Sequence, residues 1–129
     1  IHRIVIGPGS NVQDGSIIHL SDDYGVSLGA HVSVGHRAIL HACIIDDEVL
    51  VGMGAIVMDG TEIGARSIIG AGAVVTQHQK IPPGSLVLGS PARVVRNLTE
   101  VEQRKNLKLA NKYIHMARFH REHLAKLNN

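Results

Sequence analysis

The sequence predicts an all-β solenoid, a parallel β-helix built from six-residue repeats, followed by a C-terminal α-helix. Two observations carry this prediction. Aliphatic residues recur every six positions over most of the chain, and glycine follows many of them. Beyond Gly89-Ser90-Pro91 the repeat stops and a helical pattern begins. We therefore expect residues 1–97 to form the β-helix domain and residues 98–129 to form a helix that packs on the prism.

The six-residue period sets the expected strands. The fifth position of each unit is usually small or β-branched, as at Ala38, Ala55 and Ala73. Two inward side chains per repeat, with glycine near the corner, describe short strands that wind a triangular prism with coils stacked about 4.8 Å apart. A β-sandwich is the alternative, but its strands alternate with period two and do not keep one phase for so long. The aliphatic positions are Ile6, Val12, Ile18, Leu28, Val34, Leu40, Ile45, Val51, Val57, Ile63, Ile69, Val75, Ile81 and Val87.

Two breaks interrupt the phase. Four extra residues enter between Ile18 and Leu28, so we expect residues 20–27 to form a loop pushed out of the coil. One residue is missing between Leu40 and Ile45. A tolerated surface insertion is the alternative for the first break, but the loop directly follows a histidine that is a candidate ligand.

The segment after residue 98 predicts one helix. Thr99-Glu100-Val101-Glu102 has the pattern of a capping box, in which a threonine and a glutamate three residues later satisfy free backbone N–H groups. We expect this helix to lie along one face of the prism. Its apolar face is expected at Leu107, Ala110, Ile114, Ala117 and Leu124.

Composition and charge exclude several classes of protein. The 129 residues carry 13 Lys+Arg, 11 Asp+Glu and one cysteine. Dispersed basic residues and a net charge of +2 argue against a nucleic-acid partner. The lone Cys43 excludes an intrachain disulfide framework and a cysteine-based zinc cluster. No apolar run approaches the roughly 20 residues of a membrane span, so we expect no membrane partner and a cytoplasmic location.

Three of the nine histidines have positions that suggest a shared metal. Ile18 and Leu40 are 22 residues apart, which is one coil plus the insertion, so they should stack. His19 and His41 each follow these residues by one position. They should therefore project from the same corner about one sheet spacing apart, a workable separation for two ligands of one ion.

The third histidine, His36, stands two positions after Val34 on the preceding face and should point elsewhere within the same chain. A homotrimer about a threefold axis would bring His36 of one chain beside His19 and His41 of its neighbour. Three neutral imidazoles leave a fourth position open for water, as in catalytic zinc sites. For any one histidine, a hydrogen-bonding role at an interface is the alternative.

These segments carry a resemblance to a known family. Asn11-Val12-Gln13-Asp14 followed by His19, then Val34-Gly35-His36 and Leu40-His41-Ala42-Cys43, resemble the gamma-class carbonic anhydrases, which are left-handed parallel β-helix trimers. Leu88-Gly89-Ser90-Pro91-Ala92-Arg93 and the final helix resemble the bacterial branch of that family.

The resemblance implies a lyase that hydrates carbon dioxide to bicarbonate by a metal-bound hydroxide at the trimer interfaces. His19, His36 and His41 would be the metal ligands. Gln13 would orient the metal-bound water, with Asn11 nearby. The ion would be Zn²⁺. Fe²⁺ and Co²⁺ are the alternatives, because imidazole ligands discriminate weakly among these metals.

Further residues match family positions outside the ligand set. Asp22 falls in the loop where some members place an acidic proton relay, and Asp23 is its neighbouring alternative. Tyr113 matches a helix tyrosine that reaches the site in bacterial relatives, although packing of the helix on the prism would also explain it. Asp14 matches an acid at the subunit interface. The arginine and aspartate that the family carries just upstream of its counterpart of Ile1 are not in this sequence.

Two other functions use the same repeat. An acyl-CoA-dependent acyltransferase would use a histidine as general base and a pantetheine groove between subunits, but it does not need three convergent histidines. A non-catalytic β-helix subunit of a larger assembly is the third interpretation. Metal analysis separates the first function from the second, and an assay of carbon dioxide hydration separates the first from the third.

Overall fold

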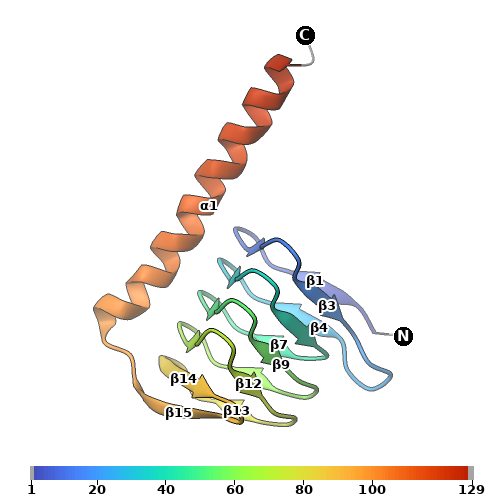
Figure 1. The fold of residues 1–129 in the computed structure, drawn as a ribbon, viewed down its shortest axis with the longest axis vertical. Coiled ribbons are helices and arrows are strands. Elements are labelled where there is room, and N and C mark those ends of the chain that lie inside the picture. The colour runs from blue at the N-terminus through green and yellow to red at the C-terminus, as the bar shows by residue number, and fades with distance from the viewer. Residues whose placement is uncertain (1, 128–129) are drawn as a thin grey trace.

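The computed structural model describes residues 2–127 and shows a stack of triangular coils followed by one long helix (Figure 1). Up to β14, successive strands pass from one sheet to the next, so each of the three sheets takes every third strand. Sheet A runs in the order β1-β4-β7-β10-β13, sheet B in the order β15-β14-β11-β8-β5-β2 and sheet C in the order β12-β9-β6-β3. The predicted parallel solenoid with a C-terminal helix is confirmed.

Most strands have two or three residues, as six-residue repeats require. Sheet A contains β1 (Ile4–Ile6), β4 (Val26–Leu28), β7 (Ile44–Ile45), β10 (Glu62–Ile63) and β13 (Lys80–Ile81). Sheet B contains β2 (Asn11–Val12), β5 (Ser33–Val34), β8 (Leu50–Val51), β11 (Ile68–Ile69), β14 (Ser85–Gly89) and β15 (Ala92–Asn97). Sheet C contains β3 (Ile17–His19), β6 (Ile39–His41), β9 (Ile56–Val57) and β12 (Val74–Val75).

Two side chains of each repeat fill the prism. Ala38 and Leu40 in one repeat, and Ala55 and Val57 in the next, have no exposed surface. The small residue lies at the corner and the larger one at the middle of the face, because the triangular section narrows toward its corners. The first coil differs, since only one neighbouring coil covers it, and its inward-facing Ile6 is 48% exposed.

Glycine follows the inward aliphatic residue where stacked corners pass close together. A Cβ atom added to Gly52 would lie 2.5 Å from the backbone nitrogen of Ala71 and 2.8 Å from the carbonyl oxygen of Ile69. Any side chain at this position would push two coils apart. The recurrent aliphatic-glycine pair in the sequence therefore reports the coil spacing directly.

The last coil ends in a hairpin. β15 pairs antiparallel with β14, with a register shift between Leu86 and Val87. Folding the chain back in this way covers the backbone groups of β14, which would otherwise be a free sheet edge. The six-residue period does not predict this hairpin, because β15 no longer follows it.

The helix α1 (Glu100–Leu127) begins as the capping box predicts. The Glu102 backbone N–H donates to the Thr99 hydroxyl at 3.2 Å, and the Thr99 N–H donates to the Glu102 carboxylate at 2.9 Å. The division into a β-helix domain, residues 1–97, and a packed helix, residues 98–129, stays a prediction. Over the part of the chain that the structure describes, no helix has the length and apolar character needed to cross a membrane.

Only the first half of α1 packs on the prism. Asn106 and Ala110 are buried, and the Asn106 amide donates to the carbonyls of Glu48 and Ser67 at 3.0 and 3.2 Å. The prediction that Ala117 and Leu124 also pack was wrong, because both are exposed. The helix is longer than the stack of coils and extends past it (Figure 1), so its later turns have no coil beneath them.

The extruded loop is shorter than predicted. Residues 20–25 leave the coil, whereas Val26 and Ser27 belong to β4 and pair with Ile4 and Val5 of β1. Val26 points inward and is 2% exposed. Its burial in the core returns the chain to the coil two residues earlier than the expected range of 20–27.

The outer faces of the three sheets differ in what covers them. α1 contacts β2 and β5 of sheet B. The outward positions of sheet A change from Val5, Ser27 and Ile44 to Glu62 and Lys80. Sheet C instead presents one outward aliphatic residue per coil, which we call the sheet C ladder: Ile17, Ile39, Ile56 and Val74.

Candidate metal centre

His19 and His41 lie side by side on successive coils, as their spacing predicts. They pair in register at the ends of β3 and β6. Their ring centroids are 5.3 Å apart with an angle of 29° between the planes. His19 Nδ1 faces His41 Nε2 at 3.3 Å. The parallel register of sheet C therefore brings two imidazole nitrogens to one point at the corner where sheet C passes into sheet A.

The separation of these two nitrogens fits a shared metal. Two nitrogens bound to one tetrahedral zinc ion at about 2.0–2.1 Å stand about 3.3–3.4 Å apart. The structure places the facing nitrogens at 3.3 Å. Imidazole nitrogens also suit zinc, iron and other first-row metals. The pair thus has both the donor type and the spacing of two ligands of one ion.

A carboxylate holds the other side of the His41 ring. His41 Nδ1 lies 2.7 Å from Asp59 Oδ1, and the two side chains are 37% and 24% exposed. This hydrogen bond holds the pKa of Asp59 below its ordinary value, and a bond from the Ser21 hydroxyl contributes in the same direction. When Nδ1–H donates to the Asp59 carboxylate, a neutral His41 presents the Nε2 lone pair toward His19.

Asp59 was not among the predicted site residues, although two features of the sequence point to it. Asp59 follows His41 by 18 residues, the length of one coil. The residue missing between Leu40 and Ile45 also falls at this corner, where Leu40 pairs with Val57. Four residues separate Leu40 from Ile45, whereas five separate Val57 from Ile63, so the carboxylate of the longer corner reaches the histidine of the shorter one.

His36 lies at the opposite edge of sheet C. It follows β5 at the corner where sheet B passes into sheet C, and it is exposed. Its carbonyl accepts from Gly54 N–H, which fixes it in the stack. Within residues 2–127, no group of three or more His, Cys, Asp or Glu side chains is placed to hold one ion. One chain therefore brings together two of the three predicted ligands.

The two predicted amides lie on the same edge as His36. The Gln13 amide donates to Asn11 Oδ1 at 3.2 Å, and the Asn11 amide donates to the Ser33 hydroxyl at 2.9 Å. Asp14 is one residue further along, and its carbonyl accepts from the N–H of Arg37. In these two hydrogen bonds the Gln13 amide oxygen takes no part. It is therefore available to accept a hydrogen bond from another group.

The remaining predicted residues occupy the loop and the helix. Asp22 and Asp23 are exposed in the loop after His19. Tyr113 is half-buried on α1, the helix whose contacts are with sheet B. Their roles, like those of Gln13 and Asn11, stay predictions.

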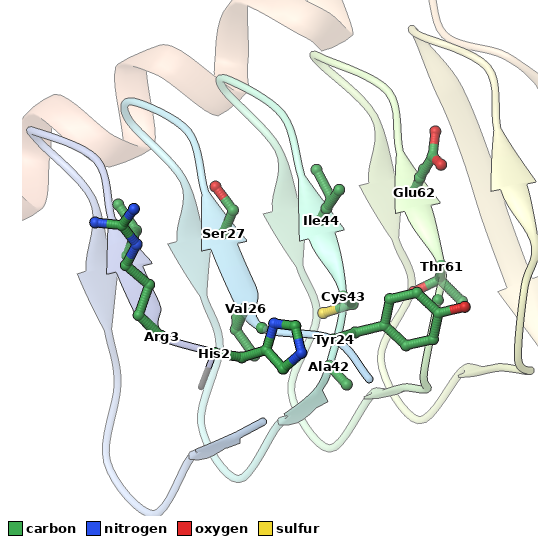
Figure 2. Close-up of a pocket in the computed structure, with 13 residues that line it drawn as sticks. His2, Arg3, Tyr24, Val26, Ser27, Ala42, Cys43, Ile44, Thr61 and Glu62 are labelled. Carbon is green, nitrogen blue, oxygen red and sulfur yellow. The ribbon is translucent and has the colours of Figure 1, made fainter. Parts of the chain in front are cut away.

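A cavity of about 480 Å³ adjoins the histidine corner on its sheet A side. His2, Arg3 and Tyr24 line it together with residues of sheet A (Figure 2). Cys43 and Glu62 also line it. The loop that follows His19 therefore forms part of a second surface feature beside the candidate centre.

Comparison with known proteins shows which family the chain resembles. Residues 42–77 match the family described as bacterial transferase hexapeptide (six repeats). A protein of Arabidopsis thaliana named gamma carbonic anhydrase 1, mitochondrial, is 34% identical over 98% of this chain and 48% of its own length. A protein of Methanocaldococcus jannaschii named "Probable carbonic anhydrase" is 48% identical over 91% of this chain and 74% of its own length. The chain belongs to the gamma carbonic anhydrase family. Its solenoid is thus the left-handed β-helix of hexapeptide repeats.

Solved structures of similar fold include members named for another chemistry. A hexapeptide transferase family protein of Anaplasma phagocytophilum is 36% identical, with a TM-score of 0.84 over 89% of this chain and 68% of that one. A Vibrio cholerae acetyltransferase complexed with acetyl coenzyme A is 26% identical, with a TM-score of 0.60 over 74% of this chain and 72% of that one. The chain spans about half the length of the Arabidopsis gamma carbonic anhydrases that it matches.

Proposed function

We propose that this gamma carbonic anhydrase family member hydrates carbon dioxide to bicarbonate at a metal centre shared between subunits of a homotrimer. His19 and His41 of one chain and His36 of the next would hold the ion. The observation that carries the proposal is the 3.3 Å approach of His19 Nδ1 and His41 Nε2, which has the spacing of two ligands of one metal.

The positions of the histidines on sheet C explain why a trimer would complete the centre. The two edges of sheet C carry different groups: His36 and Gln13 on one, His19 and His41 on the other. If three chains turn sheet C toward a common axis, the His36 edge of each chain meets the paired-histidine edge of the next. Three equivalent centres then form, each with three imidazoles.

The sheet C ladder supports this assembly. Ile17 is 55% exposed, and Ile39, Ile56 and Val74 are half-buried on a face that α1 leaves open. Burying this aliphatic strip against copies of the same strip would stabilise the trimer by the hydrophobic effect. Sheet C, which lies between the His36 edge and the paired-histidine edge, is thus also the most uniformly apolar outer face of the prism.

The chain's own residues supply positioning and proton transfer. A divalent metal held by three imidazoles lowers the pKa of a water ligand toward neutrality, which provides a nucleophile for carbon dioxide. Gln13, fixed through Asn11 and Ser33, would orient the attacking oxygen by accepting a hydrogen bond from it. Asp22, exposed in the loop after His19, would pass the released proton to solvent, with Asp23 as the alternative.

The alternative function is acyl transfer from an acyl-CoA, which the Vibrio cholerae protein's bound acetyl coenzyme A illustrates for the same fold. That chemistry requires one histidine as general base. A carboxylate behind that histidine would suit it as well, but it gives no reason for a second imidazole facing the first at 3.3 Å. We therefore place carbon dioxide hydration first.

Subunit complementation tests the shared centre. His36→Ala and His41→Ala should each lose the metal and the hydration of carbon dioxide measured by stopped flow. When the two variants are unfolded together and reassembled, roughly a quarter of the centres should regain three ligands, because random neighbours supply the missing group. His115→Ala, which alters an exposed helix histidine, is the matched control.

Two results would contradict the proposal. Metal that stays stoichiometric in both variants would exclude these ligands. Mixed trimers that recover neither metal nor activity would show that His36 and the paired histidines do not meet across chains. Acetyl transfer from acetyl coenzyme A, retained in the metal-free protein, would favour the alternative function.

A further inference from the structure

We infer that Asp59 is a positioning residue for the metal centre, which fixes the tautomer and the orientation of the His41 ring and ties the loop after His19 to that ring. The inference rests on the proposed function. It adds a residue that neither the sequence motifs nor the names of the relatives single out.

The side chains of Asp59 and His41 are in direct contact. Asp59 Oδ1 lies 2.7 Å from His41 Nδ1, a short separation typical of a charge-assisted hydrogen bond. A carboxylate only accepts, so the proton of this bond must be on Nδ1. In the neutral ring the lone pair is then on Nε2, the atom that faces His19 at 3.3 Å. Asp59 thus selects the tautomer in which His41 can bind an ion beside His19.

The backbone that carries Asp59 is held by neighbouring coils. Asp59 occupies the corner after β9, where its carbonyl accepts from the N–H of His78 and the following Gly60 donates to the carbonyl of Ala42. Both bonds join Asp59's corner to neighbouring coils. The carboxylate is therefore attached to the fixed part of the prism and not to a mobile loop.

Asp59 is also connected to the loop that follows His19. The Ser21 hydroxyl interacts with the Asp59 carboxylate, and the Ser21 and Tyr24 backbones are joined by a hydrogen bond of 3.0 Å. Tyr24 in turn lies edge-on to His78, with ring centroids 6.2 Å apart. The loop that carries Asp22 is thus held along the same corner that orients His41.

Carboxylates behind metal-binding histidines raise ligand basicity and hold ring orientation, and their removal typically costs 10–100-fold in metal affinity. A surface ion pair of the same atoms would instead contribute little and would leave metal affinity unchanged. The two interpretations therefore differ in a measurable quantity.

The experiment compares Asp59→Ala, Asp59→Asn and Glu62→Ala in the full chain. Alanine removes the acceptor, asparagine keeps a neutral acceptor, and Glu62→Ala removes an exposed carboxylate of sheet A that pairs with Lys80 at 3.2 Å. Two readouts are needed: the His41 tautomer in metal-free protein by long-range ¹H–¹⁵N NMR, and the Zn²⁺ dissociation constant by chelator competition.

We expect His41 in the metal-free native protein to carry its proton on Nδ1, and Asp59→Ala to populate both tautomers. Zn²⁺ should bind Asp59→Ala about 10–100-fold more weakly and Asp59→Asn to an intermediate degree. Glu62→Ala should match the native protein in both readouts.

Equal Zn²⁺ affinity in Asp59→Ala and the native protein would overturn the inference, as would a native His41 protonated on Nε2 or on both nitrogens at pH 8. Failure of the proposed function gives a different result. A native protein that binds no Zn²⁺ would refute the metal centre, while the tautomer measurement would still decide whether Asp59 sets the His41 ring.

Discussion

Cys43 follows His41 by two residues, yet its chemistry differs from that of the histidine. Its side chain points into the prism and is 1% exposed. Burial raises the pKa of the Cys43 thiol to about 12, and the nearby charge of Asp59 acts in the same direction, while a hydrogen bond with Thr61 opposes them. The thiol therefore stays neutral near pH 7 and is neither a nucleophile nor a metal ligand.

This state predicts that Cys43 resists thiol reagents while the chain is folded. Ellman's reagent at pH 8 should modify the native protein only as fast as it unfolds, and should modify it within seconds in guanidinium chloride. Ser27→Cys provides the control, because position 27 is exposed on the outer face of sheet A. Rapid modification of Cys43 in the native protein would contradict the inward placement.

At the residue scale, the repeat predicts which side chains point inward and which histidines stack. Ile18 and Leu40 pair as their spacing requires, and His19 and His41 follow them. The role of Asp59 was not predicted, because a carboxylate at a corner has the same pattern as any solvent-exposed turn residue. Its spacing of one coil from His41 gains meaning only with the 2.7 Å contact between the two side chains.

Among the elements, α1 depends on a cluster of charges at its first turn. Arg96 donates to both carboxylate oxygens of Glu102 at 2.8 Å, and the Thr99 N–H donates to the same carboxylate. These bonds lower the pKa of Glu102 to about 2, with Arg96 as the largest cause. The cluster thus joins the end of β15 to the beginning of the helix.

The shift in the pKa of Glu102 predicts an acid-sensitive helix start. The folded pKa lies below the ordinary value of 4.5, so the stabilisation is complete above pH 4.5 and is lost as the pH falls toward 2. Glu102→Gln should lower the thermal midpoint of the helical circular dichroism signal at pH 7, and the difference from the native protein should vanish near pH 2.

Glu100→Gln is the matched control for this prediction. Glu100 is in the same first turn but is exposed, and its bond with Arg104 is longer at 3.2 Å. Its loss should change the midpoint less. A Glu102→Gln protein whose midpoint equals that of the native protein at pH 7 would show that the cluster does not stabilise α1.

The start of α1 was predictable and its packing was not. A capping box is a local pattern, so Thr99 and Glu102 suffice to place the first turn. The packed length depends on how many coils lie beneath the helix, which no helical period reports. This is why Leu107 and Ala110 pack as expected and Leu124 does not.

For the whole molecule, the three faces of the prism have different surroundings. α1 covers part of sheet B, the outer face of sheet A becomes charged along the stack, and the sheet C ladder is aliphatic throughout. The positions of the three histidines and the family resemblance predict a trimer. The aliphatic face between the two histidine edges is an independent reason for the same assembly, which stays a prediction.

This asymmetry predicts that a charge on sheet C disrupts the assembly while the same charge on sheet A does not. Ile17→Glu and Ile44→Glu replace isoleucines of similar exposure, 55% and 48%, on the outer faces of sheets C and A. Each chain of an Ile17→Glu trimer would bury a carboxylate near its copies, which is unfavourable because the like charges repel and lose water. By native mass spectrometry we expect a mass of three chains for the native protein and for Ile44→Glu, and a mass of one chain for Ile17→Glu. A native protein that is a monomer would contradict the assembly. A trimer lost with Ile44→Glu and kept with Ile17→Glu would place the interface on another face and separate His36 from the paired histidines.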